Sequence, residues 1–179
     1  MDDEFEINRP HDTGRLYNFL ISYKFQNALE SLPFPVKDLS VLDICCGSGM
    51  ISEYYAREEA EVTGADIFSE CIKRAKIRSQ KYKFSARFQT ADSENLPFPD
   101  NSFDIVSVHD GLHHLKNPKK AIFEMARIAK KGIIIIEPAN AVITKISVLL
   151  GISTNYEEDD RVYRFKNSEA LGWLKEAGC

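Results

Sequence analysis

The sequence predicts an α/β protein built around a doubly wound, parallel β-sheet. Short apolar segments rich in β-forming residues alternate along the chain with segments of helical pattern. Two of the apolar segments, VLDI and GIIIIEP, lack the alternation of a half-exposed strand, which is typical of strands buried on both faces of a parallel sheet. A glycine-rich turn follows the first of them. This β-α-β-α order also predicts right-handed crossovers between the strands.

Five strands are expected, with helices between them. The predicted strands cover residues 41–44, 62–65, 86–90, 105–108 and 132–137. The predicted helices cover residues 50–57, 68–82 and 118–130. The helix over residues 118–130 begins where the side chain of Asn117 can cap the first turn. Pro118 can take its first helical position, which needs no N–H donor.

Two segments are expected to lie outside this core. Residues 12–32 have the pattern of an amphipathic helix on the edge of the sheet. Its apolar face would carry Leu16, Phe19, Leu20 and Tyr23. Residues 138–165 mix apolar and acidic stretches and would cover the active face of the sheet. A final helix would then be capped by Asn167 or Ser168, turn Leu171 and Leu174 inward and end at Gly178.

Composition limits what the chain can be. At 179 residues and 44% hydrophobic content it can bury one core, so a single domain over residues 1–179 is expected. A net charge of −4 argues against a nucleic-acid partner, and we interpret the basic residues 73–78 as the solvated face of a helix. No signal peptide and no membrane span are apparent, which favours the cytoplasm. The four cysteines form no C-x-x-C pair, so no metal site is expected.

The stretch CCGSG follows the first predicted strand directly. Ligands of open parallel sheets bind beyond the carboxyl ends of the strands, and the first strand-to-helix turn is the usual place. Gly47 and Gly49 would let the backbone approach a ligand closely. Asp43, the one charged residue of that strand, could orient the amides of the turn or meet a cationic ligand group. A tight turn without any ligand is the alternative reading.

Acidic residues also end the next two strands. Asp66 lies seventeen residues after Gly49, about where a dinucleotide fold places a carboxylate on ribose hydroxyls, although it could be a helix cap instead. Asp92 ends the third strand. Such an acidic rim suits a sulfonium cation that carries an adenosine better than a pyrophosphate. Ser52 stands where a dinucleotide motif has its third glycine, so a nicotinamide oxidoreductase is the less favoured enzyme class.

The chain resembles the class I S-adenosylmethionine-dependent methyltransferases, in particular the small-molecule branch related to ubiquinone and menaquinone methyltransferases. The resemblance extends over about residues 39–138. It rests on four segments in the order of that family: VLDICCGSG, VTGADIF, ADSENLPFPDNSFDIVSVHDGLHHL and AIFEMARIAKKGIIIIEP. It implies a Rossmann-like sheet of strand order 3-2-1-4-5, with residues 1–38 as a helical cap, 39–138 as the cofactor-binding core and 139–179 as a cover and last helix.

The resemblance also implies roles for individual residues toward S-adenosyl-L-methionine. Asp43 and the turn residues would hold the methionine end, Asp66 the ribose, and His109 would line the pocket near the methionine end. Ile67 would lie beside the adenine, with Asp92 and Ser93 at its amine. The turn residues in question are Cys45, Cys46, Gly47 and Gly49. Cys45 stands where the family usually has glycine, and KKG replaces the usual turn before the fifth strand.

Methyl transfer is an in-line displacement, which positioning and desolvation can accelerate without a base. A base helps if the acceptor is a phenol, a hydroxyl or a ring carbon. The segment HDGLHHL offers His109, Asp110, His113 and His114. We take His113 or His114 as the candidate catalytic residue on the acceptor side, with simple packing as the alternative. The apolar cover and the aromatic residues suggest a flat or lipophilic small-molecule acceptor, or ordinary packing.

Two further expectations concern assembly. A non-catalytic S-adenosylmethionine-binding protein or partner subunit on the same scaffold is the alternative function. The resemblance implies two more strands after the last helix, where this sequence stops at LKEAGC, so the C-terminal strand hairpin of the family is expected to be missing. The fifth strand would then be an unpaired edge, through which a homo-oligomer could form.

Overall fold

The computed structural model describes residues 3–12, 15–137, 156–157, 160–161 and 166–179. Its centre is a five-stranded, all-parallel sheet in the order β3-β2-β1-β4-β5. The strands are β1 Ser40–Ile44, β2 Glu61–Asp66, β3 Ala86–Thr90, β4 Phe103–His109 and β5 Ala129–Ile136. The predicted fold class and strand order are confirmed, and β5 begins and ends earlier than the sequence suggested.

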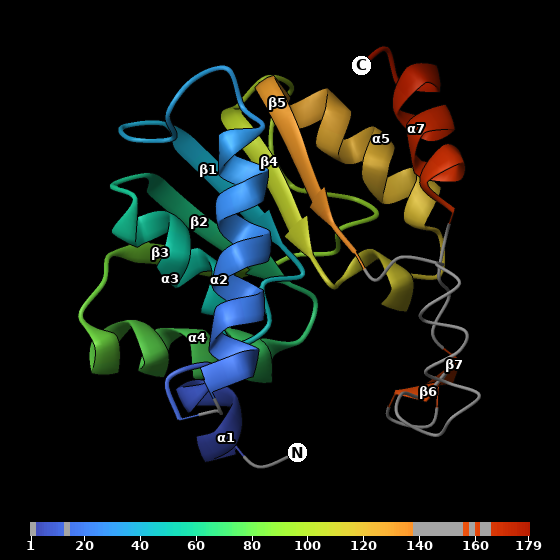
Figure 1. Cartoon of the computed structure of the whole chain (residues 1–179). Coiled ribbons are helices and arrows are strands. Elements are labelled where there is room, and N and C mark those ends of the chain that lie inside the picture. The colour runs from blue at the N-terminus through green and yellow to red at the C-terminus, as the bar shows by residue number, and fades with distance from the viewer. Residues whose placement is uncertain (1–2, 13–14, 138–155, 158–159, 162–165) are drawn as a thin grey trace.

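Helices cover both faces of this sheet (Figure 1). They are α1 Asp3–Asn8, α2 Arg15–Glu30, α3 Met50–Arg57, α4 Ser69–Tyr82, α5 Pro118–Ile128 and α7 Asn167–Glu176. A short 3₁₀ helix, η1 Leu112–His114, follows β4, and β6 Tyr156–Glu157 pairs with β7 Asp160–Arg161. The side chain of Asn117 accepts a hydrogen bond from the backbone N–H of Lys120 (3.1 Å), so the predicted cap of α5 is confirmed.

The alternation of side chains along β1 and β4 separates two cores. Leu42 and Val106 face the helix α5, in a cluster that also includes half-buried residues of α7. Val41 and Ile105 face the other way, toward α2 and α3. Since successive side chains of a strand point to opposite faces, Asp43 and His109 lie on the α2–α3 face. The polar residues at the ends of β1 and β4 therefore share one side of the sheet.

The prediction of which face of α2 is buried is wrong. The helix exists, but its buried residues are Ile21 and Phe25. The four residues expected inside are exposed by 45–71%: Leu16, Phe19, Leu20 and Tyr23. Both sets recur at helical spacing, so periodicity alone could not choose between them. Packing decides, because Phe25 lies edge-on against Tyr55 of α3 and is completely buried.

The basic stretch 73–78 is also not wholly solvated. Lys73 and Lys76 are exposed, whereas Arg78 is completely buried. Arg78 donates to the carboxylate of Glu53 (2.9 Å) and to the backbone carbonyls of Ile7 (2.9 Å) and Arg9 (2.5 Å). This side chain thus fastens the N-terminal segment to α3 and α4.

The final helix also departs from expectation. Lys166, rather than Asn167 or Ser168, is its cap residue, and Leu171 is 57% exposed. Leu174 is half-buried against the α5 core, as expected. The expected cover, residues 138–165, lies outside the described residues except for the β6–β7 pair, so its predicted role stays a prediction.

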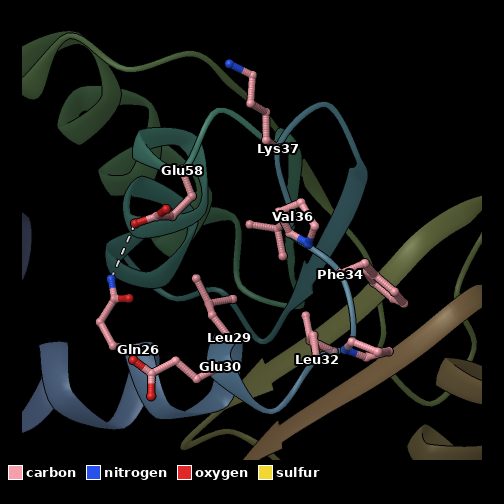
Figure 2. A pocket seen from close by; sticks show the side chains of 10 residues that line it. Gln26, Leu29, Glu30, Leu32, Phe34, Val36, Lys37 and Glu58 are labelled. Carbon is pink, nitrogen blue, oxygen red and sulfur yellow. Dashed lines mark hydrogen bonds between the residues drawn. The ribbon is translucent and has the colours of Figure 1, made fainter.

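A hollow of about 450 Å³ lies at the opposite end of the sheet from the polar strand ends. Figure 2 shows it between the end of α2, the segment that leads to β1, and Glu58 after α3. Gln26 donates a hydrogen bond to Glu58 across it (3.3 Å). Its walls precede β1 and β2, so it is not the place where a parallel sheet binds ligands.

Candidate functional site

The turn after β1 has the backbone that its glycines predict. Gly47 and Gly49 have φ angles of 53° and 78°, in the left-handed region that favours glycine. A Cβ atom on Gly49 would lie 3.1 Å from Ala75 and 3.2 Å from Phe88, whereas a Cβ on Gly47 would meet nothing within 4 Å. Gly49 is therefore closed in by packing, and the backbone at Gly47 stays accessible from outside.

Cys45 stands in the left-handed region as well, with φ of 52°. Its side chain fits because the loop after β4 provides a glycine opposite: a Cβ on Gly111 would lie only 2.5 Å from the Cβ of Cys45. The sulfur of Cys45 is 3.3 Å from the hydroxyl oxygen of Ser93. Cys45, after β1, thus contacts residues that follow β3 and β4. Because Gly111 has no side chain, it leaves room for a cysteine at a position where the family usually has glycine.

Burial disfavours the thiolate form of both cysteines of the turn. Burial, and then the nearby carboxylates of Asp66, Glu137 and Asp43, raise the pKa of the Cys45 thiol to about 12, although Ser93 opposes the shift. Burial likewise raises the pKa of Cys46 well above its ordinary value. A thiol of such high pKa stays protonated at neutral pH. The expected contacts of Cys45 and Cys46 with the cofactor do not need a thiolate, and they remain predictions.

Asp66, at the end of β2, holds the turn in place. One carboxylate oxygen accepts a hydrogen bond from the backbone N–H of Gly47 (2.9 Å), and the other accepts one from the N–H of Phe68 (2.9 Å). The sequence suggested Asp43 as one way to orient the amides of the turn, but the N–H of Gly47 donates to Asp66 instead, whereas Asp43 accepts from Ser52. Ionised carboxylates have about four acceptor sites, so Asp66 can still accept from a ligand hydroxyl.

Asp43 lies behind the turn and is 1% exposed. It accepts a hydrogen bond of 2.5 Å from the hydroxyl of Ser52 on α3. Burial raises the pKa of Asp43 to about 7, with Asp66 adding to the shift and Ser52 opposing it. A cation bound in front of the turn would favour the ionised form of this carboxyl group.

The residues expected around an adenine lie beside β2 and β3. Ile67 is 55% exposed, and Ser93 is buried. The side chain of Asp92 is exposed, and one of its oxygens accepts from the N–H of Glu94 (2.8 Å). Their expected contacts with adenine remain predictions.

His109 ends β4, and its side chain is 4% exposed. Its Nδ1 is 3.5 Å from a carboxylate oxygen of Asp110, and its buried Nε2 has no hydrogen-bond partner among the described residues. Burial lowers the pKa of this imidazole, although Asp110 opposes the shift. His109 is therefore a mostly neutral group with an uncommitted nitrogen at the end of the sheet.

The two candidate catalytic histidines differ in setting. His113 is buried, and its Nδ1 is 2.6 Å from the carboxylate of Glu137. His114 is exposed, and its ring lies 4.1 Å from that of His113, centroid to centroid. The structure therefore brings His109 and His113 into the protein interior and leaves His114 at the surface.

Sequence reasoning missed Glu137, Ser52 and Gly111 as parts of this site. Glu137 has a recognisable signal, because a carboxylate directly after the last apolar strand lies at the same edge as the other strand ends. For Ser52 the sequence indicated only that this position lacks the third glycine of a dinucleotide motif, which says nothing of its contact with Asp43.

In the part of the chain that the structure describes, no cluster of three or more histidine, cysteine or acidic side chains could hold a metal ion. No helix of that part is long and apolar enough to cross a membrane.

Comparisons with known proteins agree with this geometry. The family described as "Methyltransferase domain" matches residues 42–136, which extend from the middle of β1 through the turn to the end of β5. A demethylmenaquinone methyltransferase of Renibacterium salmoninarum is 40% identical over 92 residues, 51% of this chain and 37% of the relative. A ubiquinone/menaquinone biosynthesis C-methyltransferase of Idiomarina loihiensis is 33% identical over 120 residues, 62% of this chain and 48% of the relative.

A solved structure of similar fold is magnesium protoporphyrin IX methyltransferase from Synechocystis PCC 6803 with bound SAH. It has a TM-score of 0.74 at 20% identity, over 99% of this chain and 83% of that one. At this identity the likeness concerns the fold alone. The chain matches less than half the length of the two sequence relatives.

Proposed function

This chain belongs to the class I S-adenosylmethionine-dependent methyltransferases, and from that premise we propose that it transfers a methyl group from S-adenosyl-L-methionine to a small-molecule acceptor. The observation that carries the proposal is the turn after β1. Its backbone is accessible at Gly47, and Asp66 holds it by a hydrogen bond of 2.9 Å.

The residues around the turn fit this cofactor chemically. Asp66 has acceptor capacity left for a ribose diol, and Asp43 adds negative potential near the place of a sulfonium. The buried hydroxyl of Ser48 and the Nε2 of His109 have no hydrogen-bond partner among the described residues, and buried polar atoms of this kind are rare without a ligand. We propose that both face the methionine end. Residues 39–138 would form the cofactor-binding core.

S-adenosyl-L-methionine supplies a methyl carbon on a positively charged sulfur. In this proposal the chain contributes position, desolvation and, through His113, a proton acceptor. Because α2 packs over the side of the sheet that carries Asp43 and His109, it would help to keep water away from the reacting groups. His114, at the surface, would contact the acceptor or shape the entrance.

We propose that the acceptor is a hydroxylated aromatic ring. The support comes from the names of the two sequence relatives, which are methyltransferases of quinone biosynthesis. His113 also suits a phenolic acceptor, because an imidazole nitrogen can take up the proton of a phenol.

Two measurements test the function. Calorimetric titration should show binding of S-adenosylmethionine and S-adenosylhomocysteine, with NADH as the control that should not bind. Release of S-adenosylhomocysteine should then depend on an added acceptor such as reduced 1,4-naphthoquinone. Tighter binding of NADH than of either adenosyl compound would contradict the proposal.

Other expectations from the sequence remain proposals. We place the protein in the cytoplasm without a nucleic-acid partner, and we propose that β5 offers an edge for a homo-oligomer. Light scattering on the purified protein tests the last point, since a monomer at all concentrations would oppose it.

A further inference from the structure

The helix α2 is apolar on two opposite faces. Its inner face buries Ile21 and Phe25 in the core on that side of the sheet. Its outer face carries four exposed apolar residues, which we call the α2 stripe: Leu16, Phe19, Leu20 and Tyr23. They recur at intervals of three and four residues, so they lie along one side of the helix. A helix that is apolar on both sides is typical of one that is covered on both sides.

In the described part of the chain, the α2 stripe is open. The rings of Phe19 and Tyr23 stack on each other, with centroids 5.7 Å apart and planes inclined by 19°. Figure 1 shows α2 crossing in front of the sheet, and no other described element lies in front of it. Contiguous exposed apolar side chains of this kind mark contacts with another molecule.

The charges at the two ends of α2 indicate which molecule this is. Arg15 begins the helix and Glu30 ends it, and both side chains are exposed. Neither has an ion-pair partner among the described residues. A second α2 that runs in the opposite direction would supply both charges with a partner. We propose that a second copy of this chain covers the α2 stripe, in a two-fold dimer whose α2 helices pack antiparallel.

The spacing of the residues suits such a pair. When Phe19 lies opposite Tyr23 of the partner subunit, Arg15 comes within one helical turn of Glu30 of the partner subunit. A two-fold axis repeats both contacts, because each copy presents the same surface to the other. Apolar side chains then meet at the centre and opposite charges meet at the rim, as in specific interfaces.

Surfaces of a single charge fit α2 less well. An anionic membrane or a nucleic acid would attract Arg15 but repel Glu30. It would also repel the helix α1, which precedes α2 and carries Asp3, Glu4 and Glu6 in its first turn. Only a partner with both charges, such as a second α2, matches both ends of the helix.

The area of the α2 stripe is sufficient for a weak dimer. Aromatic side chains bury roughly 150–250 Å² each when they are fully covered, and Phe19 and Tyr23 are 61% and 58% exposed. With the two leucines, the stripe offers about 400 Å² per copy, and the charged ends raise the total for both copies to about 1,000 Å². Specific interfaces begin near this size, so we expect a dissociation constant on the order of 10 µM.

This surface is separate from the edge of β5, which would pair through backbone groups. No residue of the α2 stripe belongs to the proposed cofactor site. The dimer therefore does not rest on the proposed function, and neither proposal fails with the other.

Sedimentation equilibrium of the full chain between about 1 and 100 µM tests the dimer. The average mass should lie near that of one chain, 20.3 kDa, at the lowest concentration and rise toward twice that mass at the highest. Phe19→Lys should weaken association roughly tenfold or more, because it places a charge at the centre of the interface. Its circular dichroism should match the wild type, since Phe19 is exposed.

Ile77→Lys is the matched control. Ile77 is 50% exposed on α4, so the same kind of substitution falls on the surface of another helix. Association of this variant should equal that of the wild type.

Exchanging the two charges tests the antiparallel direction. Arg15 and Glu30 are fifteen positions apart on one helix, which is about 22 Å along its axis, so they cannot meet within one copy. Arg15→Glu and Glu30→Arg should each weaken association roughly threefold, because each sets like charges against each other at the rim. The double variant Arg15→Glu/Glu30→Arg should restore association to within about twofold of the wild type.

Three results would overturn the proposal. A wild type that stays monomeric over the whole range would leave the α2 stripe to a different partner. A dimer that Phe19→Lys leaves intact, or that Ile77→Lys weakens as much, would place the interface elsewhere, for example at β5. A double charge variant that associates no better than the single variants would exclude the antiparallel pairing.

Discussion

The carboxylate of Asp66 accepts a hydrogen bond from the backbone N–H of Gly47 at 2.9 Å, across the gap between β2 and the turn after β1. The two residues are nineteen positions apart in the sequence. Because parallel strands β1 and β2 end side by side, the acid at the end of one strand fixes the glycine turn at the end of the other. In the proposed function the same carboxylate meets the ribose, so the turn and the proposed ribose site would depend on one side chain.

Replacing Asp66 should weaken cofactor binding strongly. Asp66→Ala removes both the proposed ribose acceptor and the support of the turn, and loss of a charge-assisted hydrogen bond costs about 1.5–3 kcal/mol. Calorimetry with S-adenosylhomocysteine should therefore show an affinity about ten- to a hundredfold lower. Asp104→Ala is a useful comparison, since Asp104 accepts hydrogen bonds from Ser40 at the start of β1, at the other end of that strand from the turn. Equal affinity of Asp66→Ala and the wild type would refute the ribose assignment.

Asp43 should make the protein less stable as pH rises. Its pKa is raised from 3.8 to about 7 in the folded protein, mainly by burial. The folded state thus holds a proton that the unfolded state releases, so the stabilisation is complete below pH 3.8 and is lost as pH rises to about 7. Asp43→Asn should remove this slope in the free energy of unfolding, measured with urea at several pH values between these limits.

Asp104 provides a control of opposite sign. Hydrogen bonds from Ser40, opposed by burial and aided by Lys131, lower the pKa of Asp104 to about 2. Its stabilisation is present above the unfolded pKa and is lost only as pH falls toward 2. Asp104→Asn should therefore leave the slope between pH 3.8 and 7 unchanged. A slope that survives in Asp43→Asn would assign it to other groups.

Cys45 and Gly111 should show compensating effects on stability. A Cβ on Gly111 would lie 2.5 Å from that of Cys45, so Gly111→Ala should cost about 1–3 kcal/mol of unfolding free energy. Cys45→Gly removes the clash at a residue whose φ of 52° suits glycine, and should recover much of that loss in the double variant. A double-mutant cycle from urea unfolding measures the coupling. Additive effects would show that the loop after β4 moves away instead.

The two histidines of the loop after β4 should differ in function. His113→Gln should lower turnover at least tenfold with little change in cofactor affinity, because a positioned base contributes about 10²- to 10⁴-fold. His114→Gln should have the smaller effect, since His114 is exposed. Turnover with reduced 1,4-naphthoquinone and calorimetry with S-adenosylhomocysteine check both. Full turnover in both variants would mean that the loop only shapes the pocket.

Two phenylalanines of α2 test which face of that helix is buried. Phe25 is 0% exposed, so Phe25→Ala should cost about 3–5 kcal/mol of unfolding free energy. Phe19 is 61% exposed, and Phe19→Ala should change stability by less than about 0.5 kcal/mol. Urea denaturation of both variants measures this. A larger loss from Phe19→Ala would mean that another surface covers it.

The sequence by itself determined the parallel sheet and the glycine turn, and the strand order came from the resemblance to a known family. The sheet and the turn rest on local signals: apolar strands without alternation, a capped helix after Asn117, and glycines where a left-handed backbone is needed. The positions of Asp43, Asp66 and His109 at strand ends followed directly, because the carboxyl ends of parallel strands meet at one edge of the sheet.

The tertiary structure alone decided which side chains meet. Phe25, rather than Phe19, is buried because α3 presents Tyr55 to that side of α2. The sequence predicted a solvated Arg78, but this side chain is buried because it donates to the carbonyls of Ile7 and Arg9 in the N-terminal segment. Glu137 reaches His113 across twenty-four positions only because β5 pairs with β4. Periodicity and turn preferences act between neighbours in the chain, whereas these partners are set by contacts between distant segments, which no local pattern encodes.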